Sequence, residues 1–182
     1  MKYYSLSLVI INLIFIGCTN SISTPAINNG NKEYRYVNTA LNYSIDVPNE
    51  AAKKVPSPDS LILGFINYDY TTNHIPSNGY YLSIEGIKNI TSNLLPCSPE
   101  QVGIYPTSAI KSDSGDIISI RGKADYAEVM KGDYDHTHEP TCKGGYAFCS
   151  EHAGKQVTIC ISQQTDNPKL ANEIFDSFKW TK

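Results

Sequence analysis

The chain has 182 residues, of which 41% are hydrophobic and 18% are charged, and its formal net charge is −3. This length is typical of one domain. A mildly acidic balance without a long run of basic residues argues against a surface that binds nucleic acid or anionic lipid headgroups. The sequence therefore predicts no nucleic-acid partner.

Residues 1–17 have the pattern of a secretory signal peptide. Lys2 is the only charged residue before Lys32, and the apolar run at 5–17 is shorter than the roughly 20 residues of a membrane-spanning helix. The run ends in IFIGC (14–18), which resembles the lipobox of bacterial lipoproteins. The resemblance implies cleavage before Cys18, a diacylglyceryl group on its thiol and an acylated amine. An ordinary signal peptide and an uncleaved anchor are the alternatives.

Acylation at Cys18 would give the chain a permanent partner, the lipid bilayer, because two or more acyl chains anchor a protein stably whereas one binds marginally. Thr19 follows where the enterobacterial sorting pattern has an aspartate for retention in the inner membrane. By that resemblance we expect anchoring to the outer membrane. The domain would then lie in the periplasm or at the cell surface.

Residues 18–33 are predicted to form a flexible tether. They are rich in Asn, Ser and Thr and have too few apolar side chains to fold alone. A flexible chain of about 15 residues spans on the order of 20 Å. The remaining residues, 34–182, are enough for one globular domain with a sizeable core.

Four cysteines remain once Cys18 is assigned to lipid, and in an oxidising compartment an even number predicts two disulfides. Residues 144–162 alternate like a β-hairpin, and a two-residue turn at Gly154–Lys155 would place Cys149 opposite Cys160. We therefore favour the pairs Cys149–Cys160 and Cys97–Cys142. The other two connectivities, and reduced buried thiols, remain open.

Most of the domain has the alternating pattern of β-strands, with strands expected at 33–37, 42–47, 60–70, 79–87, 115–122 and 125–131. The C-terminus has a helical period instead. Asn167 is a suitable N-cap and Pro168 a suitable first helical residue. The apolar residues that follow lie on one stripe: Leu170, Ala171, Ile174, Phe175 and Phe178.

The segments YRYVNTALNYSIDVPNE (34–50) and VTICISQQTDNPKLANEIFDSFKW (157–180) together resemble the two ends of PsbP-like proteins and the related Ran-binding import factors. The resemblance implies an α+β fold: an antiparallel sheet sandwiched by helices and closed by the C-terminal amphipathic helix. The middle of the chain has no counterpart in that family. Its members are mostly partner-binding domains, so the resemblance favours binding over catalysis.

One loop has the residue types of a metal site. Asp133, Asp135, His136, His138 and Glu139 lie within seven residues, and imidazole with carboxylate ligands suits zinc or copper. If the loop binds metal, His136 and His138 are the ligands, with Asp135 or Glu139. The alternative is a solvated loop without a cofactor.

The sequence has no nucleophile elbow, zinc-protease helix or phosphate-binding glycine loop, so we expect no enzyme. Two functions remain as hypotheses. The first is an envelope lipoprotein that binds a protein partner as an accessory or immunity-type protein; an exposed patch of Tyr68, Tyr70, Tyr80 and Tyr81 would favour it. The second is metal binding by the loop at 133–139.

Overall fold

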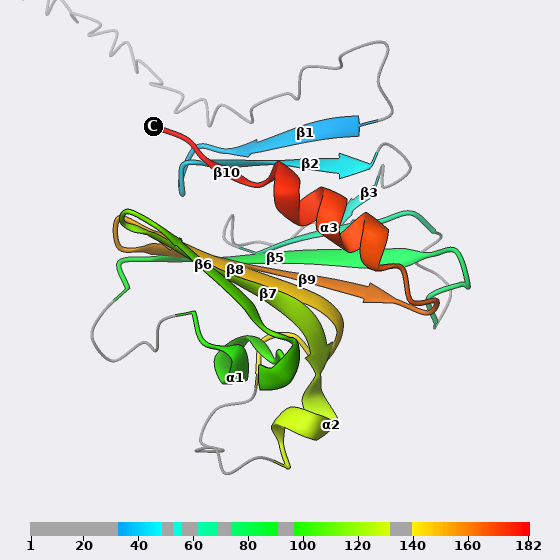
Figure 1. Cartoon of the computed structure of the whole chain (residues 1–182). Helices are drawn as coiled ribbons and strands as arrows, with labels where there is room; N and C mark the ends of the chain where they lie inside the picture. Colours follow the sequence, from blue (N-terminus) through cyan, green and yellow to red (C-terminus); the bar gives the residue numbers. More distant parts are fainter. Residues whose placement is uncertain (1–32, 49–52, 56–61, 69–73, 91–96, 132–139) are drawn as a thin grey trace, which may run out of the picture.

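Two antiparallel β-sheets and one ten-residue helix make up most of the chain that the computed structural model describes, which comprises residues 33–48, 53–55, 62–68, 74–90, 97–131 and 140–182 (Figure 1). The strands are β1 Glu33–Asn38, β2 Tyr43–Pro48, β3 Lys53–Val55, β4 Ile62–Ile66, β5 Tyr80–Lys88, β6 Ile110–Ser114, β7 Ile117–Asp125, β8 Gly144–His152, β9 Lys155–Gln163 and β10 Lys179–Trp180. The helices are α1 Pro99–Val102, α2 Tyr126–Val129 and α3 Pro168–Ser177, with a short 3-10 helix, η1, at Pro106–Ser108.

The two sheets form two layers. The smaller sheet has the order β1-β2-β10, and the larger has the order β3-β4-β5-β9-β8-β7-β6. The smaller sheet and α3 lie on one side of the larger sheet, and α1 and α2 lie on its other side (Figure 1). The larger sheet therefore contributes side chains to a core on each of its faces.

The main core lies between the layers and draws apolar side chains from β2, β4, β5, β8, β9 and α3. It includes Ile45 from β2, Leu82 from β5 and Ile159 from β9, each with no exposed surface. Each fully buried side chain of this size contributes about 1.5–3 kcal/mol relative to leaving it in water. The alternation of buried and more exposed residues along β5 follows from the period of two in an extended strand, whereas β9 has six consecutive buried residues because both of its faces are covered.

The turn between β1 and β2 inserts Leu41 into this core. The side chain of Asn38 accepts hydrogen bonds from the amides of Ala40 and Leu41, both at 3.0 Å, and so fixes the turn. Leu41 packs directly on Gly86 of β5, where a Cβ atom would lie 2.0 Å from Leu41 Cδ1. Any larger residue at position 86 would have to displace the Leu41 side chain.

The C-terminal helix begins where the sequence predicts. The Asn167 side chain accepts a hydrogen bond from the Leu170 amide at 3.2 Å, and Pro168 is the first helical residue. Ala171, Ile174 and Phe175 are buried against the sheets. The apolar stripe therefore faces the main core.

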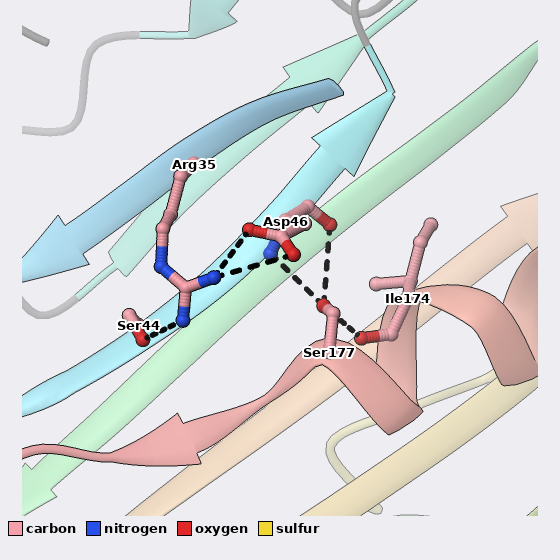
Figure 2. A network of polar contacts seen from close by, with 5 residues as sticks. All are labelled: Arg35, Ser44, Asp46, Ile174 and Ser177. Carbon is pink, nitrogen blue, oxygen red and sulfur yellow. Dashed lines mark hydrogen bonds and ion pairs between the residues drawn. The ribbon is translucent and has the colours of Figure 1, made fainter. Parts of the chain in front are cut away.

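Hydrogen bonds connect the C-terminal end of α3 to β2 (Figure 2). The Ser177 hydroxyl accepts a hydrogen bond from the Asp46 amide at 2.9 Å and lies 2.6 Å from the Ile174 carbonyl oxygen. From β1, the Arg35 guanidinium contacts two residues of β2: the Asp46 carboxylate at 3.2 Å and the Ser44 hydroxyl at 2.9 Å. These bonds link β1, β2 and α3.

The predicted fold class is wrong: the protein is mostly β, and its sheet is not sandwiched by helices. The layer that was expected to be helical consists largely of a second sheet, because β2 pairs with both β1 and the C-terminal β10. On the opposite face, α1 and α2 have four residues each. The strand expected at 125–131 is also wrong, because Asp125 caps α2 by accepting a hydrogen bond from the Glu128 amide.

Two disulfides form, as the number of cysteines predicts, but their pairing differs from the favoured one. Cys97 bonds to Cys149 and Cys142 bonds to Cys160. All four belong to a second core, between the larger sheet and α1. Each disulfide therefore ties a strand of the central hairpin to a segment outside that hairpin.

The favoured pairing fails because the hairpin has a different register. Its turn residues are Ala153 and Gly154, with φ of 49° and 73°, so His152 pairs with Lys155. Two successive positive φ values are the signature of a type I′ turn, in which glycine or asparagine usually comes first. Cys149 therefore faces Thr158 rather than Cys160. The observed register is shifted by two residues from the predicted one. Because side chains alternate between the two faces of a strand, a shift of two leaves Phe148 and Ile159 on the predicted apolar face.

Candidate functional site

A cleft of about 570 Å³ lies on the main-core side of the larger sheet, between strands β6–β8 and the end formed by α3 and β10. The main core draws on β4, β5, β8 and β9, and no residue of β6 or β7 belongs to it. All five residues of β6 are exposed. The cleft thus exists because the larger sheet extends beyond the layer that covers it.

A row of hydroxyl groups forms part of the cleft floor. Ser112 of β6 pairs with Ser119 of β7, which in turn pairs with Ser150 of β8, so the three side chains stand side by side on one face. The Ser112 and Ser119 hydroxyl oxygens are 2.7 Å apart. Ser150 donates to the Ile118 carbonyl at 3.1 Å. The row can both donate and accept hydrogen bonds.

The neighbouring row of the floor contributes a cation, Arg121, to the cleft, and Lys179 of β10 is a second cation that lines it. Ile110, Arg121 and Phe148 are in register across the same three strands. The guanidinium of Arg121 contacts the carboxylate of Asp176 on α3 at 2.5 Å, and the two side chains are 35% and 66% exposed. An ion pair so open to water contributes little to stability. Both groups remain accessible to a ligand.

The wall of the cleft is aromatic. Phe178 packs edge-on against Trp180, with ring centroids 5.3 Å apart, and the Phe148 ring stacks on Phe175 at 5.4 Å. The Trp180 indole donates a hydrogen bond to the Ser150 hydroxyl at 2.9 Å. This bond satisfies the one polar group of the indole, so its ring edge can line the cleft without a buried, unpaired donor.

A second polar cluster lies further along β7. Lys123 contacts the Asp166 carboxylate at 3.2 Å, and the Tyr146 hydroxyl donates to the same carboxylate. The hydrogen bond from Tyr146, followed by that from Lys123, lowers the pKa of Asp166. Burial, together with the hydrogen bond to Asp166, raises the pKa of Tyr146 to about 12. None of these residues lines the cleft.

The sequence-predicted site residues are not the ones that line this cleft. Cys18 lies outside the described residues, as does the whole loop at 133–139 with His136 and His138. In the part of the chain that the structure describes, no three His, Cys, Asp or Glu side chains are grouped as a metal site requires. Lipidation and metal binding therefore stay predictions.

The tyrosine patch that would have favoured a protein interface cannot include Tyr80, which is 3% exposed and belongs to the main core, and Tyr70 lies outside the described residues. The cleft residues Arg121, Asp176 and Trp180 were missed. They come from β7, α3 and β10, and a pattern within one strand says nothing about which segments become neighbours. The one available signal was Trp180, the single tryptophan of the chain.

Within the described ranges, no helix has the length and apolarity needed to cross a membrane. The sequence matches no protein-family model, no curated protein and no solved structure.

Proposed function

We propose that this chain is a lipid-anchored envelope protein that binds a protein partner, without catalysis, through the cleft between β6–β8 and α3–β10. Its role would be that of an accessory or immunity-type protein. The observation that carries the proposal is the cleft, which places an aromatic wall beside an accessible Arg121–Asp176 pair.

The residue types in the cleft favour a protein as the ligand. Tryptophan, phenylalanine and arginine are enriched at protein interfaces, and tryptophan and arginine dominate the binding energy of many of them. Trp180, Phe178 and Arg121 all line the cleft. The hydroxyl groups of Ser112 and Ser119 beside them can pair with the backbone groups of a bound segment, whereas Ser150 is buried and already bonded to Ile118 and Trp180.

The cleft can be tested with a matched pair of charge reversals on one strand. Arg121→Glu reverses the charge of a residue that lines the cleft, whereas Lys123→Glu reverses the charge two residues along β7, at a lysine that also contacts an exposed aspartate but does not line the cleft. Affinity capture of each full-length variant from its own cells, with mass spectrometry, compares the partners retained. We expect Arg121→Glu to lose a partner that the wild type and Lys123→Glu both recover. An unchanged set of partners with Arg121→Glu would overturn the assignment of the cleft.

The anchor needs a separate test, because it concerns residues outside the described ranges. Cys18→Ala should move the chain from the membrane fraction to the soluble fraction, since no acyl chain could then be attached. Thr19→Ala is the matched control and should stay with the membrane. If Cys18→Ala remained membrane-bound, or if Cys18 proved to be disulfide-bonded, the lipoprotein assignment would fail.

A further inference from the structure

We infer that two copies of this chain associate through the outer edge of β6, as a symmetric antiparallel pair of strands centred on Ser112. β6 is the last strand of the larger sheet, so one of its two edges has no strand beside it among the described residues. All five of its residues are exposed. An unpaired edge of this kind is a template for another strand.

The backbone groups that β6 presents follow from its turn. Ser114 pairs with Ile117 across the two-residue loop Gly115–Asp116, and the pair that closes such a loop is hydrogen-bonded. Hydrogen-bonded pairs alternate along an antiparallel ladder, so Ser112 and Ile110 also bond towards β7. Lys111 and Asp113 therefore point their amide and carbonyl groups to the open edge.

Only a few registers can join two such edges. Residues opposite each other must both present outward groups, which leaves Lys111 opposite Lys111, Asp113 opposite Asp113, or Lys111 opposite Asp113. The first two place like charges face to face across a two-fold axis, which is destabilising. The third, centred on Ser112, makes two opposite-charge pairs and is the register that we propose.

The side chains already suit that register. Lys111 Nζ lies 4.0 Å from Asp113 Oδ1, so both charges are on the same face of β6, and both side chains are 59% exposed. In the pair, each lysine would lie between its own aspartate and that of the second copy. The same strand supplies both partners of each contact, and this self-complementarity is what a two-fold interface requires. It favours a second copy of the chain over an unrelated strand.

The other face of β6 is continuous with the cleft. In the proposed register Ser112 lies opposite Ser112 of the second copy. The row Ser150–Ser119–Ser112 would therefore continue into the same row of the second copy. Ile110, which is 61% exposed, would gain Ser114 of the second copy as a neighbour. The two clefts would open on the same face of one continuous sheet, so a dimer could engage a partner with two copies of its binding surface.

Cross-linking of the full chain expressed in its own cells tests the register directly. A Ser112→Cys variant would place two thiols across the axis in a non-hydrogen-bonded pair, with Cα atoms about 4.5 Å apart, which is within the range of a disulfide. Ser114→Cys is the matched control on the same face. Its two thiols would be displaced by four residues, roughly 13 Å along the strands. We expect a dimer on non-reducing gels for Ser112→Cys alone.

Charge exchange tests the same interface without a new cysteine. Lys111→Asp should weaken dimerisation of the full chain in detergent by about tenfold, because both cross-strand pairs change from attraction to repulsion. Asp113→Lys should do the same. The double variant Lys111→Asp/Asp113→Lys should restore dimerisation, since the two pairs are re-formed with their charges exchanged. Analytical ultracentrifugation measures each dissociation constant.

The inference does not depend on the proposed partner of the cleft, because Arg121 takes no part in the edge contact. Cross-linking that is equal at positions 112 and 114 would overturn the register. A chain that sediments as a monomer at every concentration tested, or a double variant that stays as weak as the single ones, would overturn the dimer.

Discussion

Ser177 and Asp46, which are 131 residues apart, hold α3 and β2 together by a hydrogen bond from the Asp46 amide to the Ser177 hydroxyl. β10 pairs with β2 at Tyr43 and Ser44 alone, because the chain preceding it is helical. The Asp46 amide therefore has no strand neighbour on that side. The serine hydroxyl takes the place of the missing strand.

Removal of this hydroxyl should destabilise the protein. We expect Ser177→Ala to lower the free energy of unfolding by about 1 kcal/mol or more, because a half-buried amide loses its acceptor. Urea unfolding measures the loss. Ser114→Ala, at an exposed serine, is the control and should change stability by less than about 0.5 kcal/mol. Equal effects of the two substitutions would contradict this role of Ser177.

This relationship also shows why the fold class was missed. The alternation of β2 and the helical period of α3 are visible in the sequence, because each depends on neighbours within one segment. The second sheet depends on β10, which has two residues and no period to read. The C-terminal helix could be predicted from the sequence. The strand β10 that follows it, which is the third strand of the smaller sheet, could not.

The turn between β8 and β9 carries a strained residue. Ala153 has a φ of 49°, a region that alanine adopts at a steric cost and glycine adopts freely. We expect Ala153→Gly to stabilise the protein, by up to about 1 kcal/mol, because relief of that strain outweighs the added flexibility of the unfolded chain. The melting temperature measures the gain. Gly154→Ala, which introduces strain at a φ of 73°, should lower it.

The two disulfides should differ in their contribution to stability. Cys97–Cys149 closes a loop of 52 residues and Cys142–Cys160 one of 18. In the chain-entropy model these correspond to about 4 and about 3 kcal/mol. We expect the double variant Cys97→Ser/Cys149→Ser to lose more stability in urea than Cys142→Ser/Cys160→Ser. Peptide mapping should recover the same two pairs from the oxidised wild type, and a Cys149–Cys160 peptide would contradict the structure.

The residues that line the cleft were harder to predict from the sequence than the fold was. Ser112, Ser119 and Ser150 form one row because β6, β7 and β8 are neighbours in that register, and Ser150 is 31 residues from Ser119 along the chain. The disulfide pairing failed for a related reason, since a two-residue shift of the hairpin changed the residue opposite Cys149. Local period determines which face a side chain takes, whereas register and strand order determine its neighbours.

The contact between Tyr146 and Asp166 should make stability depend on pH. The Asp166 pKa in the folded protein lies below its value of about 3.9 in the unfolded chain, chiefly because the Tyr146 hydroxyl donates to the carboxylate. A lowered folded-state pKa contributes stability above the unfolded value, and that contribution is lost as pH falls through the folded value. The contribution of this contact to the free energy of unfolding is therefore lost at pH values below about 4.

Tyr146→Phe should raise the Asp166 pKa towards its ordinary value, as followed by NMR titration of the carboxyl carbon, because the largest cause of its lowering is removed. Lys123→Met removes the other hydrogen bond together with the charge of the ammonium, and should also raise the Asp166 pKa. The free energy of unfolding that Tyr146→Phe costs at pH 7 should shrink as pH falls below about 4, where the carboxylate becomes protonated in both states. A cost independent of pH would mean that Tyr146 acts through packing alone, and an unchanged Asp166 pKa would show that the hydrogen bond does not form in solution.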